Sequence, residues 1–244
     1  MLKTFGTPPL FMEATGQWPP EVVGLHGWAR DRNDFRAAFQ GLSAAAIDLP
    51  GFGMTPAPEE PWDTRRYGQQ VASFLHDVGQ PVVLVGHSFG GRVAVRIARD
   101  EPQLVRGLVL SGAPIMRIDR PTRRPAAAYR LIRRANQLGL LSDARLEQAR
   151  QRYGSADYAA AQGVIREILV GVLQEEYVED LRLIDHPVTL LWGEGDRDVP
   201  VEVARAAHRE LPHSEVITVP GTGHGLVWDR PDALRSAIDG MLAR

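Results

Sequence analysis

The hydrophobic positions of this 244-residue chain form short apolar runs that alternate with stretches of helical spacing. Runs rich in valine, leucine, isoleucine and alanine and bounded by turn residues predict strands, whereas a period of 3.6 predicts amphipathic helices. The predicted strands are Leu10–Ala14, Glu21–Leu25, Ala44–Ile47, Pro81–Val85, Leu108–Leu110, Val188–Trp192 and Val216–Val219. This alternation predicts an α/β fold with a mostly parallel, doubly wound sheet.

The pattern also predicts local features near the start and middle of the chain. Leu10–Ala14 and Glu21–Leu25, separated by a glycine and proline turn, are expected to form an opening strand pair. Asp63 is expected to cap a helix that runs through Val78, and Gly91–Asp100 shows helical spacing directly after a predicted strand.

Period two changes to period 3.6 around Ser88, within Leu84-Val-Gly-His-Ser-Phe-Gly-Gly91. A serine presented between a buried strand and a helix must adopt a strained backbone conformation. Gly86 and Gly90 flank the serine at positions where a side chain would collide with the neighbouring strand or helix. This Gly-x-Ser-x-Gly elbow makes Ser88 the candidate nucleophile, and the alternative is a glycine-rich turn with an inert serine.

A serine hydroxyl needs a base within hydrogen-bond reach, and the base needs a third group that fixes its tautomer. Asp196 lies in an acidic loop at the carboxyl end of a predicted strand, where sites form in open α/β sheets. His224 lies in a glycine-rich loop after the last predicted strand. The order Ser88, Asp196, His224 belongs to this architecture. We therefore predict these three residues as a catalytic triad, with Asp198 as the alternative acid.

An acyl oxyanion requires two preorganised donors, and the backbone N–H groups of Trp28 and Phe89 are the candidates. Their rings either line an acyl pocket or pack in the core. Among the other histidines, His26 is expected to brace the loop that precedes Trp28. His87 is expected to point away from His224.

Together these motifs resemble the α/β-hydrolase superfamily, and within it the capped, cofactor-free esterases and C–C hydrolases. The resemblance covers essentially the whole chain outside one segment, and its motifs are His26-Gly27-Trp28, Asp48-Leu-Pro-Gly-Phe-Gly53, Gly86-His-Ser-Phe-Gly-Gly91, Trp192–Asp196 and Gly223-His224. It implies the α/β-hydrolase fold and chemistry that needs no cofactor or metal. Serine at position 88 argues against the similar dehalogenases and epoxide hydrolases, which use aspartate there.

Residues 113–185 contain no predicted strand and separate two strands that should be neighbours. Helical patterns at Pro125–Gln137, Ser142–Tyr153 and Ser155–Leu173 fit inside this segment. We therefore predict a hydrolase core of residues 1–112 and 186–244 with an inserted helical lid. The lid is expected to line the substrate pocket with Leu138, Leu140, Tyr153 and Tyr158.

The formal net charge of −2 conceals a basic lid, because ten arginines stand against three acidic residues between Arg117 and Arg152. Arg92 follows the nucleophile by four residues, and Gly90-Gly91-Arg92 is similar to the elbow of menaquinone-pathway lyases, whose arginines hold substrate carboxylates. A C–C hydrolase or proton-abstracting lyase for an anionic substrate is therefore an alternative. Solvated helix faces in an arginine-rich sequence are the simpler interpretation of these side chains.

Composition sets the remaining expectations. The chain has no cysteine, which excludes disulfides and thiolate metal sites, and 44% of its residues are hydrophobic, as in ordinary globular proteins. We expect no secretory segment, no membrane span and no nucleic-acid partner, and therefore a cytoplasmic monomer or homodimer. The leading function is a carboxylesterase that forms an acyl-enzyme on Ser88 with a small to medium ester. A non-catalytic receptor or scaffold is the alternative from another class.

Overall fold

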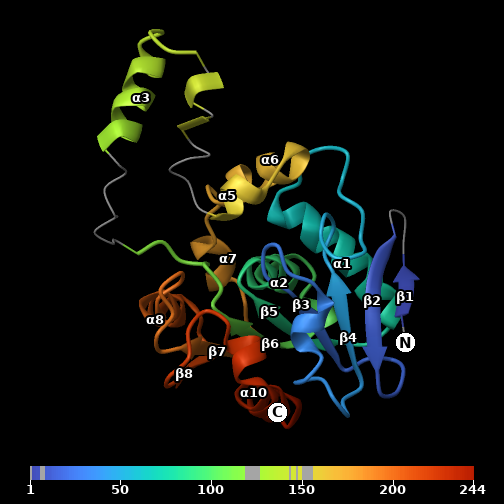
Figure 1. The fold of residues 1–244 in the computed structure, drawn as a ribbon. Coiled ribbons are helices and arrows are strands. Elements are labelled where there is room, and N and C mark those ends of the chain that lie inside the picture. The colour runs from blue at the N-terminus through green and yellow to red at the C-terminus, as the bar shows by residue number, and fades with distance from the viewer. Residues whose placement is uncertain (1, 6–8, 119–126, 143, 147, 150–155) are drawn as a thin grey trace. The chain divides into compact units, whose positions relative to one another are not determined.

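The computed structural model describes residues 2–5, 9–118, 127–142, 144–146, 148–149 and 156–244. The chain forms two compact units, one of Met1–Ile118 with Glu175–Arg244 and one of Asp119–Gln174 (Figure 1). The second unit covers fewer residues than the segment 113–185, which the sequence analysis predicted to be an insert. No helix among the described residues is long and apolar enough to cross a membrane.

The larger unit is built on a sheet whose described strands have the order β1-β2-β4-β3-β5-β6-β7-β8. The strands are β1 (Leu2–Phe5), β2 (Leu10–Thr15), β3 (Val22–Leu25), β4 (Ala44–Asp48), β5 (Val82–His87), β6 (Val105–Ser111), β7 (Val188–Gly193) and β8 (Ser214–Val219). From β4 to β8 neighbouring strands are parallel, which confirms the predicted mostly parallel sheet. Strands β3, β5 and β7 bury every residue, as expected for strands covered on both faces.

The predicted pairing of the first two apolar runs is wrong. Strand β2 pairs antiparallel with β1 on one side and with β4 on the other, whereas β3 lies between β4 and β5. Burial agrees with this order: all four residues of β3 are buried, as suits a strand in the middle of the sheet, while β2 is only partly buried and lies next to the terminal strand β1. The pairing of β6 with β7 across the insert is confirmed.

Helices cover both faces of the sheet (Figure 1). The helices of this unit are α1 (Thr64–Val78), α2 (Phe89–Asp100), α7 (Val178–Arg182), α8 (Val201–Glu210), α9 (Leu226–Asp229) and α10 (Pro231–Leu242), with 3-10 turns η1 (Arg32–Phe35) and η2 (Pro102–Leu104). Helix α2 packs on β3, β5 and β6. Apolar side chains of α9 and α10 share a core with Val83 and Val85 of β5 and Val109 of β6. Asp63 caps α1 by accepting a hydrogen bond from Arg66 N, as predicted.

The smaller unit contains helices α3 (Ala127–Gln137), α5 (Ala156–Ala160) and α6 (Gly163–Val172). The single helix predicted over Ser155–Leu173 is therefore interrupted. The break occurs where Gly163 adopts a φ of 51°, which a continuous right-handed helix does not allow. Helix α6 buries Ile168, Leu169 and Val172, three of the residues that defined its apolar stripe.

Two arginines of α2 hold the two chain segments that connect to the smaller unit, one through ion pairs and one through a hydrogen bond, and both segments belong to the larger unit. On the incoming segment, Arg96 of α2 bonds the carboxylate of Asp180 and, at 3.1 Å, that of Glu175. Glu175 also accepts the backbone N–H of Thr64 at 2.9 Å, at the first turn of α1. On the outgoing segment, Arg92 Nε donates to Pro114 O at 3.2 Å.

Candidate active site

Ser88 stands at a sharp turn between β5 and α2. Its φ of 49° and ψ of −111° lie in a region that costs a non-glycine residue about 1–3 kcal/mol, which confirms the predicted strain. A side chain at Gly86 would overlap the backbone of Gly91 in α2, and one at Gly90 would overlap the carbonyl of Leu25 in β3. The two flanking glycines therefore let strand, serine and helix approach as closely as they do.

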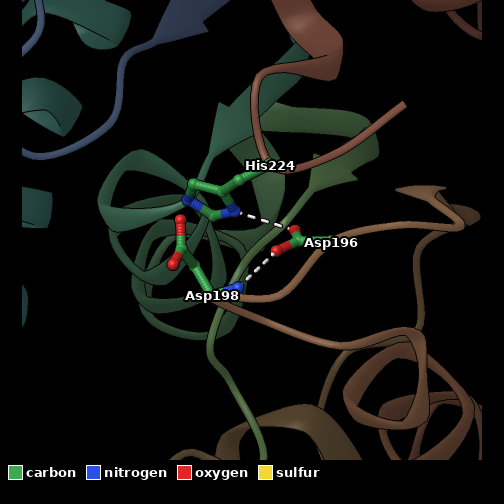
Figure 2. Close-up of side chains that lie close together, drawn as sticks. All are labelled: Asp196, Asp198 and His224. Carbon is green, nitrogen blue, oxygen red and sulfur yellow. Dashed lines mark hydrogen bonds and ion pairs between the residues drawn. The ribbon is translucent and has the colours of Figure 1, made fainter. Parts of the chain in front are cut away.

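Asp196 and His224 form a partly buried hydrogen-bonded pair (Figure 2). The distance from His224 Nδ1 to Asp196 Oδ2 is 2.8 Å, and the Asp196 side chain is 1% exposed. A carboxylate only accepts hydrogen bonds, so the proton of the neutral imidazole lies on Nδ1 and Nε2 keeps a lone pair. The ring is thus prepared to accept a proton at Nε2.

Hydrogen bonds between two loops bring the pair together across 28 residues of sequence. Glu194 N donates to Val219 O at 3.0 Å, and Gly195 N donates to Thr222 O at 2.8 Å. The end of β6 closes the site, because a side chain at Gly112 would come within 2.9 Å of the His224 ring. Position 112 therefore has no space for a side chain.

The loop around Asp196 also positions Asp198. Asp196 Oδ1 accepts the backbone N–H groups of Asp198 at 3.0 Å and Val199 at 2.8 Å, which fixes the carboxylate (Figure 2). Asp198 is exposed, and one of its carboxylate oxygens lies within 4.8 Å of ligand atoms of Asp196 and His224. Among the described residues this is the one group of three that could hold a metal ion, but two of its ligand atoms already bond each other.

The two candidate oxyanion donors lie next to the serine. A Cβ atom at Gly27 would be 3.4 Å from Ser88 Cβ, which places the start of the Trp28 loop against the nucleophile. The rings of Trp28 and Phe89 are in edge contact at 5.3 Å. Within the described part of the chain, neither backbone N–H donates a hydrogen bond. Both donors therefore remain available.

The histidine expectations have different outcomes. His26 braces its loop as predicted, because its Nε2 accepts the backbone N–H of Leu49 at 2.9 Å and burial lowers its pKa. The prediction that His87 points away from His224 is wrong, since their ring centroids lie 4.9 Å apart. The alternation of β5 places His87 on the face of Val83 and Val85, and the His224 loop lies on that side.

The other predicted pocket residues lie in several places. Arg92 is buried beneath the elbow, where its guanidinium lies over the Tyr177 ring at 5.6 Å and burial lowers its pKa. Leu138 and Leu140 follow α3 and are 67% and 73% exposed. Tyr158 lies in α5, with the Arg166 guanidinium over its ring. Tyr153 is outside the described residues.

Sequence reasoning missed two backbone groups that organise the site. Ser111 O accepts Ser88 N at 2.8 Å and bonds His87 Nδ1 at 3.1 Å. Gly112 adopts a φ of 56°, and a Cβ atom there would lie 2.9 Å from the His224 ring and 3.3 Å from Asp196 Oδ2. The Ser111-Gly112 pair at the end of a predicted strand was the available signal, but its importance depends on the pairing of β5 with β6.

Among the hydrogen bonds of the described residues, His224 bonds Asp196, and none joins Ser88 Oγ to His224. The His224 ring contacts the ring of His87, the residue before Ser88, at a centroid distance of 4.9 Å. An apo site often lacks the catalytic hydrogen bond that forms with substrate.

Comparison with known proteins gives a consistent result. The model of the alpha/beta hydrolase family matches residues 22–237. The chain is 26% identical to the pimeloyl-[acyl-carrier protein] methyl ester esterase of Yersinia enterocolitica, over 94% of this chain and 95% of that protein. It is 23% identical to a 2-hydroxy-6-oxononadienedioate/2-hydroxy-6-oxononatrienedioate hydrolase of Pseudomonas, over 91% of this chain and 84% of that protein.

Solved structures share the fold. A thermophilic esterase from Thermogutta terrifontis matches with a TM-score of 0.72 and 24% identity, over 99% of this chain and 97% of that one. A bromoperoxidase from Bacillus anthracis matches with a TM-score of 0.76 and 20% identity, over the full length of both chains.

Proposed function

Because the chain belongs to the alpha/beta hydrolase family, and is therefore a hydrolase, we propose that it cleaves a small to medium carboxylic ester through an acyl-enzyme on Ser88. The observation that carries this proposal is the imidazole of His224, held by Asp196 at Nδ1, in a chain whose elbow serine has a strained backbone. The full-length similarity to an esterase of Yersinia enterocolitica supports it.

In the first step Ser88 Oγ attacks the ester carbonyl carbon while its proton passes to His224 Nε2. The negative charge that develops on the carbonyl oxygen is stabilised by the backbone N–H groups of Trp28 and Phe89. Asp196 stabilises the resulting imidazolium through the hydrogen bond at Nδ1. The C–O bond to the alcohol then breaks, and His224 gives its proton to the leaving oxygen.

In the second step a water molecule attacks the acyl-enzyme. His224 removes a proton from this water, the same two N–H groups stabilise the new oxyanion, and the bond to Ser88 Oγ breaks. The serine recovers its proton from His224 and the carboxylic acid leaves. The chain's own residues supply every proton transfer, so the proposal includes no cofactor or metal.

The smaller unit is inserted in the sequence where we predicted a lid. In this proposal it selects the substrate. Its helices α3, α5 and α6 are inserted between β6 and β7, whose carboxyl ends lie at the site edge of the sheet. Leu138, Leu140 and Tyr158 are the described residues of this unit to which we assign a part in substrate selection.

The alternative on an anionic substrate, a C–C hydrolase or lyase, depends on a cationic side chain that faces the substrate. Arg92 and the arginines of the predicted lid were the candidates, and of these Arg92 donates to Pro114 O and lies over Tyr177. These contacts favour the ester hydrolase.

Labelling with an organophosphonate probe followed by peptide mapping tests the proposal. We expect modification at Ser88, and turnover of p-nitrophenyl esters of graded acyl length well above the uncatalysed rate. Labelling at another residue, or none, contradicts the nucleophile. A folded protein with neither labelling nor turnover would instead support the receptor or scaffold alternative.

A further inference from the structure

Two aromatic rings, those of His87 and Trp228, lie in a row next to the ring of the candidate base His224. The ring of His87 contacts that of His224 at a centroid distance of 4.9 Å and an interplanar angle of 47°. On its other side His87 meets Trp228 of α9 at 5.3 Å, nearly edge to face at 88°. His87 is therefore enclosed between the base and a tryptophan, although it has no role in the proton transfers.

Hydrogen bonding fixes the tautomer of the His87 ring, and burial keeps the ring neutral. Its Nδ1 lies 3.1 Å from Ser111 O, and a carbonyl only accepts, so Nδ1 carries the proton. Burial, and secondarily the charge of a protonated His224, lowers its pKa to about 3. Arg30 and His26 act in the same direction, while the Ser111 bond opposes them. The ring is thus neutral at every pH at which the enzyme would work.

The ring of Trp228 is also held in place on the side away from His87. The guanidinium of Arg30 lies 3.9 Å from the centroid of the Trp228 ring. Arg30 itself donates from Nε to both carboxylate oxygens of Asp34 at 3.0 Å. A cation on the ring face and an ion pair behind it hold the partly exposed Trp228 against His87.

The single hydrogen bond to Asp196 fixes one atom of His224 and leaves the ring free to pivot about that bond. We propose that His87, supported by Trp228, is a positioning residue that fixes the plane of the His224 ring so that Nε2 points at Ser88. This inference rests on the proposed function of Ser88 and His224. The shared acceptor Ser111 O, which bonds both Ser88 N and His87 Nδ1, keeps nucleophile and positioning residue in register.

A neutral neighbour suits this position. When His224 takes the proton of Ser88 it becomes a cation, and a second protonated histidine at 4.9 Å would oppose that charge. His87 instead provides an uncharged ring whose only N–H is already bound to Ser111 O. It can restrain the base without competing for its proton.

Four variants test the proposal. His87→Gln retains an N–H donor for Ser111 O but removes the ring, and Trp228→Ala removes the outer support. Trp228→Phe is the conservative rescue, because it keeps a ring against His87. Trp18→Ala is the matched control, since Trp18 is 42% exposed and Trp228 38%, and Trp18 packs on Phe74 of α1 instead. The readouts are the second-order rate of phosphonate labelling at Ser88, and kcat and KM for p-nitrophenyl acetate.

We expect labelling and kcat to fall by about tenfold or more in His87→Gln, with KM little changed, because a small misplacement of a catalytic group can cost that much. Trp228→Ala should show a smaller loss that Trp228→Phe restores and Trp18→Ala does not reproduce. Wild-type rates in both His87→Gln and Trp228→Ala would overturn the positioning role. So would a loss that Trp18→Ala matches. Failure of the wild-type protein to label at Ser88 would overturn the proposed function instead.

Discussion

Asp196 is the most constrained side chain of the site. Its two carboxylate oxygens accept three hydrogen bonds, from His224 Nδ1 and from the backbone of Asp198 and Val199. The loop therefore holds the Asp196 carboxylate in place, and the carboxylate in turn orients the His224 ring. An asparagine amide at this position can donate a hydrogen bond to His224 Nδ1. It would therefore stabilise the tautomer of His224 whose proton lies on Nε2.

We therefore expect Asp196→Asn to lower kcat by about 10⁴, the loss found when a triad histidine is held in the wrong tautomer. Steady-state hydrolysis of a p-nitrophenyl ester measures it. The matched control is Asp198→Asn, two residues away, whose carboxylate makes no hydrogen bond or ion pair within the described residues. It should change kcat little. The opposite ranking of the two variants would assign the acid to Asp198.

His87 predicts a pH dependence of stability. Its pKa is about 3 in the folded protein and about 6.5 in an unfolded chain, so below pH 6.5 the unfolded state binds more protons. The contribution of the neutral His87 ring to the free energy of unfolding is therefore fully present above pH 6.5 and is lost as the pH is lowered. Between pH 7 and pH 5 this group should cost the folded state about 2 kcal/mol.

Urea unfolding of the wild-type protein and His87→Gln at the two pH values measures this difference. The variant lacks the titrating group, so its free energy of unfolding should depend less on pH by that amount. Equal pH dependence in the two proteins would contradict the buried neutral state of His87.

The sequence predicted the candidate triad because each member has a chemical type and a place after a predicted strand that can be recognised together. The contact of His87 with His224 was not predictable in the same way. Alternation along β5 indicates which face His87 occupies, but the loop that carries His224 reaches that face only after β7 and β8 have joined the sheet. Contacts of this kind depend on tertiary structure.

At the scale of elements, α2 connects the nucleophile to the segments that lead to and from the smaller unit. Ser88 precedes its first turn, Arg92 bonds Pro114 O on the outgoing segment, and Arg96 binds Glu175 and Asp180 on the incoming segment. These arginines look in sequence like polar positions of an exposed helix face. In the structure both are buried.

Arg96→Met should destabilise the protein by about 3–5 kcal/mol, because it leaves buried carboxylates with fewer cationic partners. Asp180 keeps Arg65 at 3.3 Å and Arg99 at 3.5 Å, so the loss is concentrated at Glu175. Chemical unfolding measures it. An exposed ion pair provides the control: Arg205→Met, which removes the partner of Glu202 at 3.6 Å, should have a small effect. Similar values for the two variants would contradict the stabilising role of the buried network.

The sequence predicted which segments form strands better than it predicted which strands pair with each other. The apolar runs identified every strand from β2 to β8, since a buried strand needs apolar side chains whatever its position. The terminal strand β1 lay outside the predictions, and the order of β2, β3 and β4 depends on which edges must be covered. Gly163 interrupts a helix whose apolar stripe is continuous in sequence, because its φ of 51° is decided locally.

At the scale of the whole molecule, charge is divided unevenly between the two units. The basic stretch between Arg117 and Arg152 lies almost wholly in the smaller unit, while the rest of the chain is acidic. Described arginines of α3, Arg130, Arg133 and Arg134, are exposed. If the smaller unit selects substrate, these charges decide whether an anionic ester is favoured.

We expect neutral and anionic esters of equal length to be hydrolysed with similar dependence on salt. Arg92 is the arginine nearest the nucleophile in sequence, and it is occupied by Pro114 O and the Tyr177 ring. Charges at exposed positions act over the Debye length, which is about 8 Å at 0.15 M ionic strength, so any steering by α3 should be weak under those conditions. The measurement is kcat/KM for a matched ester pair from low to high salt. A preference for the anionic ester that disappears with Arg92→Ala, but persists when Arg130 is replaced by alanine, would contradict this expectation and favour the lyase-like alternative.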